Sequence, residues 1–244
     1  MPRAARTKSS TGVYHIMLRG VNRQRIFGDD ADCLRFLAAL QRFREELGVE
    51  LYAWCLMGNH VHLLLGFGDA SPELLMKKLS CSYVPYFNRR YDRVGHLFQD
   101  RFRSENVENE AYLAAVMRYI HKNPEKAGIS PMEAYRWSSY REYTGRAVYA
   151  DTAPMLDWFG GRDAFEAFMQ QADEEPHLDV EEKGPDRPEP ESALAALLGQ
   201  RRLEELSAPV RRELLRQLRA QGYSVREISR AAHIPTGTLY GLLR

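Results

Sequence analysis

Apolar residues in the first 150 positions recur with two different periods, which predict a mixture of strands and helices. Alternation with a period of two predicts strands over residues 11–19, 49–57, 60–65 and 101–107. Helical spacing predicts three helices, which begin near residues 29–30, 71 and 108. Gly48 ends the first of these helices, and the second reaches about Tyr91. Pro124 disfavours helical geometry at Asn123, so the third helix is expected to end there.

The order of these elements is strand, helix, strand, strand, helix, strand, helix. This order is compatible with the α+β class, and specifically with a ferredoxin-like antiparallel sheet that has helices on one face. A tight turn at Gly58-Asn59 would join the second and third strands. The other face of the sheet would be open, and the third helix could lie against it.

The chain beyond this region changes in composition. Residues 1–150 are expected to form the main domain, and residues 151–172 a helical extension of it. Residues 173–191 are acidic, contain several prolines and have few apolar side chains, as is typical of a linker. Residues 192–244 are predicted to form a small all-α region.

The C-terminal region has the pattern of a helix-turn-helix. Ser224 and Glu227 have capping-box spacing at the start of a short helix, and Pro235 marks a turn before a last helix over residues 236–244. The side chains expected to face DNA are Thr236, Thr238 and Tyr240. The alternative is a helical packing module that has no role in DNA binding.

The net charge of +1 hides an uneven distribution of charged residues. Residues 1–150 carry 22 Lys and Arg against 16 Asp and Glu, residues 151–200 carry 3 against 13, and residues 201–244 carry 9 against 4. The two basic regions suit a polyphosphate partner, which would repel the acidic segment between them. The apolar runs are too short to cross a membrane and the N-terminus does not read as a signal peptide, so a cytoplasmic protein without a membrane partner is expected.

Two histidines lie within an otherwise apolar run, in the sequence His60-Val61-His62-Leu63. Side chains alternate between the faces of a strand, so both imidazoles project to the same side while Val61 projects to the other. Such a pair could begin a divalent metal site, and a third ligand would have to come from elsewhere in the chain. The alternative is that both histidines are partly buried and hydrogen-bonded.

The predicted helix that starts near residue 108 carries a tyrosine and an amide at its end. Tyr119 and Asn123 are four residues apart and therefore lie one turn apart on one helix face. The amide oxygen of Asn123 is a candidate third metal ligand. Oxygen combined with imidazole favours Mg²⁺ or Mn²⁺, and Mn²⁺ is the better match to nitrogen.

The chain resembles the single-tyrosine HUH endonucleases, specifically the REP-associated tyrosine transposases and their insertion-sequence relatives. The resemblance begins with Tyr14-His15-Ile16 and includes His60-Val61-His62, Tyr119 and Asn123-Pro124. The matching blocks occur in family order over roughly the first 145 residues, at positions 14–24, 55–65, 87–91, 95–102, 118–128 and 137–140. The family has a residue that is small or apolar after the Asn-Pro pair, and Glu125 departs from that pattern.

The resemblance implies a metal-dependent enzyme that cuts and rejoins single-stranded DNA near hairpins during DNA transposition. Tyr119 would be the nucleophile that forms a 5′-phosphotyrosine, and His60, His62 and Asn123 would hold the metal ion. The metal, Arg118 or a nearby lysine such as Lys122 could favour the tyrosine anion, and the sequence does not decide among them. A homodimer is a possible active unit in this family.

Basic residues alternate with aromatic ones in two stretches, a pattern that suits single-stranded nucleic acid. With the arginines of the other matching blocks, the residues predicted to bind DNA are Arg19, Arg23, Arg89, Arg90, Arg101, Arg103 and Arg118. The alternative is that most of the rings belong to the core and most of the arginines are solvated.

Two other functions compete with the transposase. A DNA-binding regulator could keep the fold and the helix-turn-helix without any chemistry, although it would not need His60, His62, Tyr119 and Asn123 together. A metal-dependent phosphodiesterase that uses water as its nucleophile would not depend on the Tyr119 hydroxyl.

Overall fold

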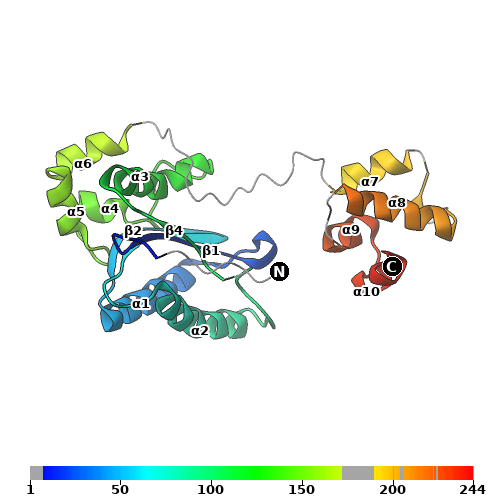
Figure 1. Ribbon diagram of the computed structural model, residues 1–244, viewed down its shortest axis with the longest axis horizontal. Coiled ribbons are helices and arrows are strands. Elements are labelled where there is room, and N and C mark those ends of the chain that lie inside the picture. The colour runs from blue at the N-terminus through cyan, green and yellow to red at the C-terminus, as the bar shows by residue number, and fades with distance from the viewer. Residues whose placement is uncertain are drawn as a thin grey trace. The chain divides into compact units, whose positions relative to one another are not determined.

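The computed structural model describes residues 8–99, 101–171, 190–199, 201–203, 206–221, 223 and 225–243. The chain divides into two compact units, residues 1–180 and residues 181–244. The first unit contains a four-stranded antiparallel sheet in the order β2-β3-β1-β4 (Figure 1). Its strands are β1 (Val13–Arg19), β2 (Glu50–Met57), β3 (His60–Gly66) and β4 (Arg103–Asn106). This order confirms the predicted ferredoxin-like sheet.

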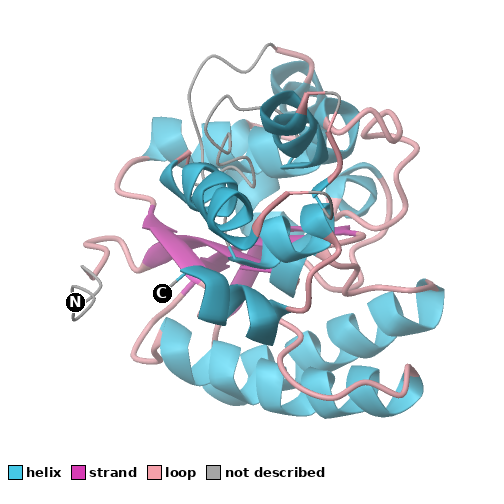
Figure 2. Cartoon of the chain, turned by 90° about the vertical axis from the view of Figure 1, so that its right-hand side faces the viewer, coloured by secondary structure: helices cyan, strands magenta, loops and turns pink. Residues whose placement is uncertain are grey.

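Helices cover both faces of the sheet. The helices α1 (Asp30–Leu47) and α2 (Pro72–Arg90) lie on one face, below the sheet in Figures 1 and 2. The helix α3 (Glu110–Lys126) lies on the other face, where Val116, Met117 and Ile120 pack with Cys55 and Leu64. The prediction of helices on one face of the sheet therefore holds for α1 and α2, whereas α3 covers the other face. The face expected to be open is closed by the apolar stripe of α3.

The alternation of β3 separates two cores. Val61, Leu63 and Leu65 belong to the cluster that α1 and α2 cover, while Leu64 belongs to the cluster beneath α3. His60 and His62 share the side of Leu64 because side chains two residues apart project to the same face. Every residue of β3 is buried, so the two histidines lie inside the protein, between the sheet and α3.

The ends of the helices follow local chemistry. The side chain of Asp29 caps the start of α1 by accepting hydrogen bonds from the amides of Ala31 and Asp32. Gly48 ends α1 with a left-handed φ of 63°, a conformation that glycine adopts without strain. Ser71 caps α2 through the amide of Leu74. These boundaries agree with the sequence pattern.

The end of α3 differs from the prediction. The helix does not end at Asn123 but continues to Lys126 and includes Pro124. Pro124 lacks an amide donor of its own, but the carbonyl of Asn123 still accepts a hydrogen bond of 3.0 Å from the amide of Ala127. One further turn of helix therefore follows the Tyr119 and Asn123 pair.

Three shorter helices follow in the first unit: α4 (Tyr140–Thr144), α5 (Thr152–Phe159) and α6 (Arg162–Met169). The helix expected from residue 153 to residue 172 is broken into α5 and α6 at Gly160 and Gly161. Both glycines have positive φ, at 84° and 111°, and so reverse the chain. Of the predicted linker 173–191, residues 173–189 lie outside the described residues, and residues 190–191 belong to α7.

The second unit has its own helical core. It consists of α7 (Pro190–Leu198), α8 (Ala208–Ala220), α9 (Val225–Ala232) and α10 (Thr236–Leu243). Leu215, Ile228 and Leu239, from α8, α9 and α10, are fully buried in this core. His233 turns the chain between α9 and α10 with a left-handed φ of 53°. In the described part of the chain, no helix has the length and apolar content needed to span a bilayer.

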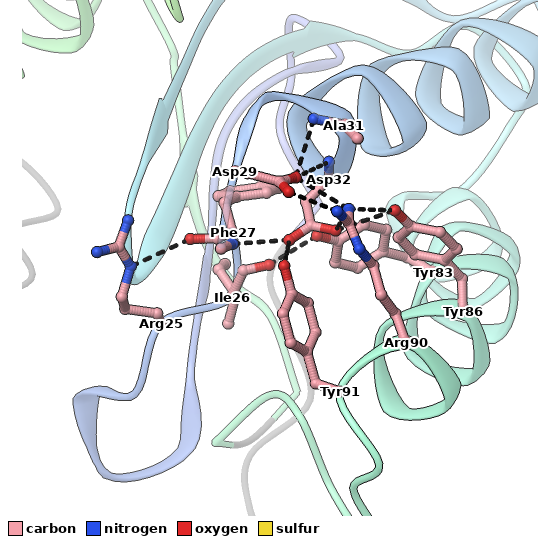
Figure 3. A network of polar contacts seen from close by, with 11 residues as sticks. Arg25, Ile26, Phe27, Asp29, Ala31, Asp32, Tyr83, Tyr86, Arg90 and Tyr91 are labelled. Carbon is pink, nitrogen blue, oxygen red and sulfur yellow. Dashed lines mark hydrogen bonds and ion pairs between the residues drawn. The ribbon is translucent and has the colours of Figure 1, made fainter.

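A polar network joins the start of α1 to the end of α2 (Figure 3). Asp32 is fully buried, and one of its carboxylate oxygens accepts hydrogen bonds from Arg90 Nη1 at 2.7 Å and Tyr86 Oη at 3.0 Å. The other oxygen accepts from the Gly28 amide and from Tyr91 Oη, both at 2.7 Å. The same network holds the loop before α1, whose Ile26 carbonyl accepts a hydrogen bond from Tyr83 Oη.

This loop supports the turn that precedes the first histidine. The amides of Ile26 and Phe27 donate to the carbonyl of Gly58, at 2.8 and 3.2 Å. Gly58 and Asn59 form the turn between β2 and β3, as predicted, and His60 is the next residue. The buried Asp32 therefore helps to fix the start of β3.

We expect the substitution Asp32→Asn to lower the free energy of unfolding of the first unit by about 2–3 kcal/mol. An amide has one acceptor oxygen, and its NH₂ group would face two hydrogen-bond donors in either orientation. Urea unfolding followed by tryptophan fluorescence measures this change, because Trp54, Trp137 and Trp158 all belong to this unit.

The matched control for this substitution is Asp30→Asn on the same helix. Asp30 is exposed, and its carboxylate accepts hydrogen bonds from the side chains of Arg136 and Trp137 at the surface. Loss of the Asp30 charge is expected to lower the free energy of unfolding by less than about 1 kcal/mol. Equal effects of the two substitutions would contradict the structural role given to Asp32.

Candidate active site

The two histidines of β3 face α3 and point to the same region. His62 is fully buried and His60 is 7% exposed. In the sheet, His62 lies opposite Met17 of β1 on one side and opposite Cys55 of β2 on the other. The rings of His60 and His62 meet edge to face, with centroids 5.0 Å apart. The strand geometry expected from the sequence is therefore observed.

The helix α3 brings an amide and a phenol to these histidines. The Oδ1 atom of Asn123 lies 3.1 Å from Nε2 of His60, and its Nδ2 atom lies 3.4 Å from Nε2 of His62. The Tyr119 ring stands edge-on to the His62 ring, with centroids 5.5 Å apart. Both residues are buried, since Asn123 is 6% and Tyr119 is 2% exposed. The four residues singled out in the sequence thus lie together.

The donor atoms of this cluster fit a divalent cation. Two ligands that hold one ion at about 2.1 Å lie about 3.0–3.4 Å from each other, and Oδ1 of Asn123 lies 3.1 Å from Nε2 of His60. His60 also has Asn59 Oδ1 at 2.7 Å from its Nδ1. A neutral imidazole has one N–H, so donation to Asn59 leaves a lone pair on Nε2 that faces the Asn123 oxygen. His60 and Asn123 would be two of the residues that hold such a cation.

Burial keeps His62 in the form that binds metals. The pKa of His62 lies well below 6.5, chiefly because burial disfavours the imidazolium, with further contributions from His60 and His15. A neutral imidazole is the form that can donate a lone pair to a metal. Within the described residues, no group of three or more His, Cys, Asp and Glu side chains is arranged to hold a metal ion.

A third histidine in the cluster was not singled out from the sequence. His15 of β1 is fully buried, and its Nε2 atom lies 2.9 Å from Nδ1 of His62. Its ring stacks on the His62 ring and touches the Tyr119 ring edge-on. The alternation of β1 is visible in the sequence, but which of its faces meets His62 depends on the pairing of β1 with β3.

The surroundings of Tyr119 change the choice of groups that could stabilise its anion. Arg118 lies over the ring of Phe168, 4.4 Å from its centroid, and Lys122 donates to the carbonyl of Gln171. The two candidates named from the sequence thus contact residues at or after α6. Lys126 instead has its Nζ atom 4.4 Å from the centroid of the Tyr119 ring. It belongs to the helical turn that the sequence pattern did not predict.

Glu125 has a structural role that explains its position beside the cluster. Its Oε1 atom accepts a hydrogen bond of 2.9 Å from the amide of Met132. The carboxylate therefore ties the end of α3 to the chain that follows it. The departure from the family pattern at this position is accommodated by that contact.

The arginines predicted to bind DNA lie in different environments. Arg90 forms ion pairs with Asp29 and Asp32, so its charge serves the fold (Figure 3). Arg118 is 8% exposed and packs on α6. Of the remaining arginines, Arg19 is half-buried. The exposed ones are Arg23, Arg89, Arg101 and Arg103. In the second unit, Thr238 is exposed, whereas the side chains of Thr236 and Tyr240 lie outside the described part.

A groove of about 590 Å³ lies next to the cluster. Asn59 lines this groove, and its side chain also contacts Nδ1 of His60. Its other lining residues include two arginines, two aspartates and three aromatic side chains, namely Arg23, Arg25, Asp29, Asp30, Phe27, Tyr135 and Trp137.

Comparison with known proteins gives a family and a fold. Residues 8–123 match the family of IS200-like transposases. The structure of a REP-associated tyrosine transposase bound to a REP hairpin aligns with a TM-score of 0.51 and 18% identity, over 61% of this chain and 88% of that one. A putative transposase from Deinococcus radiodurans aligns with a TM-score of 0.35 and 22% identity, over 50% of this chain and 97% of that one. No curated protein sequence matches the chain.

Proposed function

The chain belongs, through residues 8–123, to the IS200-like family of single-tyrosine transposases, and from this premise we propose that it cleaves and rejoins single-stranded DNA with Tyr119. The observation that carries the proposal is the meeting of four side chains from β3 and α3. His60, His62, Tyr119 and Asn123 are buried together, with the amide of Asn123 between the two imidazoles.

In the proposed reaction, the Tyr119 oxygen attacks the phosphorus of a phosphodiester. The new bond joins the phenolic oxygen to phosphorus, and the bond from phosphorus to the 3′ oxygen breaks. The products are a 5′-phosphotyrosine and a free 3′-hydroxyl, which takes up the proton that the phenol releases. One phosphoester replaces another, so a 3′-hydroxyl can reverse the step and join the strands without ATP.

The residues around Tyr119 have separate tasks in this scheme. His60, His62 and Asn123 would hold Mg²⁺ or Mn²⁺, and such an ion withdraws charge from a phosphate oxygen when it is bound. The ammonium group of Lys126, close to the Tyr119 ring, favours the phenolate electrostatically. The burial of Tyr119 keeps bulk water from the phosphotyrosine, which limits its hydrolysis.

The groove beside Asn59 is proposed to guide the DNA strand to this cluster. Arg23 and Arg25 would contact phosphates, while Tyr135 and Trp137 offer rings on which bases can stack. The related transposase of known structure binds a REP hairpin. We extend this substrate class to the present chain and propose hairpin-containing single-stranded DNA as the substrate.

The second unit is proposed to supply a separate contact with DNA. Its support is the arrangement of α9 and α10, two short helices joined by a turn at residues 233–235 and packed on α8. The helix α10 would carry Thr236, Thr238 and Tyr240 to the DNA. The basic character of residues 201–244 agrees with this role.

The test of the proposed function is a search for a covalent protein–DNA adduct. The full chain is incubated in Mn²⁺ with a hairpin-containing single strand. The label is placed on the 3′ side of the cleavage site, because the 5′-phosphotyrosine would keep this part of the strand on the protein. Denaturing electrophoresis should then show the label migrating with the protein, and chelation of Mn²⁺ should prevent this. The same sequence as a blunt duplex is the control and should give no adduct.

The outcomes of this test separate the competing functions. An adduct supports the tyrosine transposase. Metal-dependent cleavage without an adduct would reject it in favour of a phosphodiesterase that uses water. Retained DNA binding without cleavage would reject both enzymes in favour of a DNA-binding regulator.

A further inference from the structure

His15 is a fully buried histidine to which the proposed reaction gives no role. It faces α3 because residues 13, 15, 17 and 19 share one face of β1. Its nearest polar neighbours are Nδ1 of His62, at 2.9 Å from its Nε2, and Oε2 of Glu105, at 3.7 Å from its Nδ1. Glu105 lies directly opposite His15 in the pairing of β1 with β4. The three side chains form a row that runs from the edge strand to the candidate cation site.

The hydrogen bond between His15 and His62 has two possible directions, and they predict different protons on His62. In the first, Nδ1–H of His62 donates to Nε2 of His15, which leaves a lone pair on Nε2 of His62. In the second, Nε2–H of His15 donates to Nδ1 of His62, so the proton of His62 must be on Nε2. Only the first form leaves His62 able to bind a cation through Nε2.

Contacts at both ends of the row favour the first direction. At one end, Nδ2 of Asn123 lies 3.4 Å from Nε2 of His62, and an amide NH₂ needs a lone pair there rather than a second hydrogen. At the other end, the first direction puts the proton of His15 on Nδ1, beside the Glu105 carboxylate. The second direction would turn a lone pair toward that carboxylate.

We propose that His15 is a positioning residue, which accepts the Nδ1–H of His62 and so fixes the tautomer that leaves Nε2 of His62 free for the cation. Glu105 supports this arrangement through the charge that it presents to Nδ1 of His15. The inference rests on the proposed function, because it assigns His62 to a cation. Such outer contacts of metal-binding histidines commonly set ring orientation and tautomer.

Two substitutions of His15 separate this role from simple packing. In His15→Leu, the side chain stays bulky but becomes apolar and accepts no hydrogen bond. In His15→Gln, the amide oxygen can occupy the position of Nε2 and accept the same hydrogen bond. A packing role would be preserved by leucine, whereas the positioning role would be preserved by glutamine.

The first measurement needs no metal. The imidazole nitrogens of ¹⁵N-histidine-labelled full-length protein report by NMR which nitrogen of His62 is protonated. Wild type and His15→Gln are expected to show a proton on Nδ1 of His62. His15→Leu is expected to lose this preference. A proton on Nε2 of His62 in the wild type would overturn the inference.

The second measurement is Mn²⁺ binding by titration calorimetry on the full chain. His15→Leu is expected to weaken Mn²⁺ binding by about 10- to 100-fold, and His15→Gln to recover most of that loss. Glu105→Gln should weaken binding by less than His15→Leu. Its matched control is Glu108→Gln, because Glu108 bonds to Ser10 and should have no effect on the cation.

These measurements keep the inference separate from the proposed function. If wild type binds Mn²⁺ and a folded His15→Leu variant binds it equally well, the inference fails and the proposed function stands. If His62 has its proton on Nδ1 in a His15-dependent way but no Mn²⁺ binds, the cation site of the proposed function fails and the tautomer assignment stands.

Discussion

The substitution Tyr119→Phe is expected to abolish the covalent adduct and to lower the rate of DNA cleavage by at least about 10⁴-fold, because it removes the attacking oxygen. The phenylalanine ring can keep the edge-on contacts with His15 and His62. The fold and the cation ligands should therefore survive. Denaturing electrophoresis of labelled hairpin DNA measures the adduct, and gel-shift titration should show retained binding of uncleaved DNA.

The matched control is Tyr112→Phe. Tyr112 lies on the same helix, α3, and packs partly buried against the same apolar cluster. Loss of its hydroxyl should leave the amount of adduct within about twofold, as for a surface change away from the chemistry. An adduct that persists in Tyr119→Phe at the level of the wild type would reject Tyr119 as the nucleophile.

The substitution His60→Ala is expected to lower cleavage by about 10³-fold at a Mn²⁺ concentration that saturates the wild type. One ligand is removed, so the remaining pair of His62 and Asn123 would hold the ion weakly. Raising the Mn²⁺ concentration should restore part of the rate. This recovery distinguishes a lost ligand from a lost nucleophile, because Tyr119→Phe should stay inactive at any Mn²⁺ concentration.

His121→Gln is the control for the loss of a histidine near this cluster. His121 is also fully buried, but its Nε2 atom contacts Ser139 Oγ at 2.8 Å, and a glutamine amide can make the same contact. Burial lowers the pKa of His121 to about 3, so His121 is neutral at the pH of the assay, as the replacing glutamine is. The variant should keep the metal dependence of cleavage. Equal losses in His60→Ala and His121→Gln would indicate general damage to the fold.

Much of the fold and of the site follows from short-range patterns. The period of two in β3 put His60 and His62 on one face, and the spacing of four put Tyr119 and Asn123 on one side of α3. These relations involve neighbours in the sequence, so they need no knowledge of the tertiary structure. The ferredoxin-like sheet was also predicted, because few sheet topologies accommodate that order of elements.

The remaining features depend on which distant segments meet. The role of His15 depends on the register that pairs β1 with β3, and the sequence of β1 alone does not specify that register. Arg90 was predicted to bind DNA from its basic and aromatic surroundings in α2, but its partners Asp29 and Asp32 lie at the start of α1. The continuation of α3 to Lys126 depends on the hydrogen bond of the Asn123 carbonyl, which Pro124 leaves intact.

The strand order has a consequence for the chain while the ribosome makes it. The hairpin of β2 and β3 joins adjacent segments and can form as soon as both have emerged, whereas β1 must wait for β3 and β4. The helix α3, which carries Tyr119, is synthesised after all four strands. Nascent chains that end before this helix contain His60 and His62 but lack Tyr119. Under the proposed function, a nascent chain therefore gains its nucleophile only after the whole sheet has been synthesised.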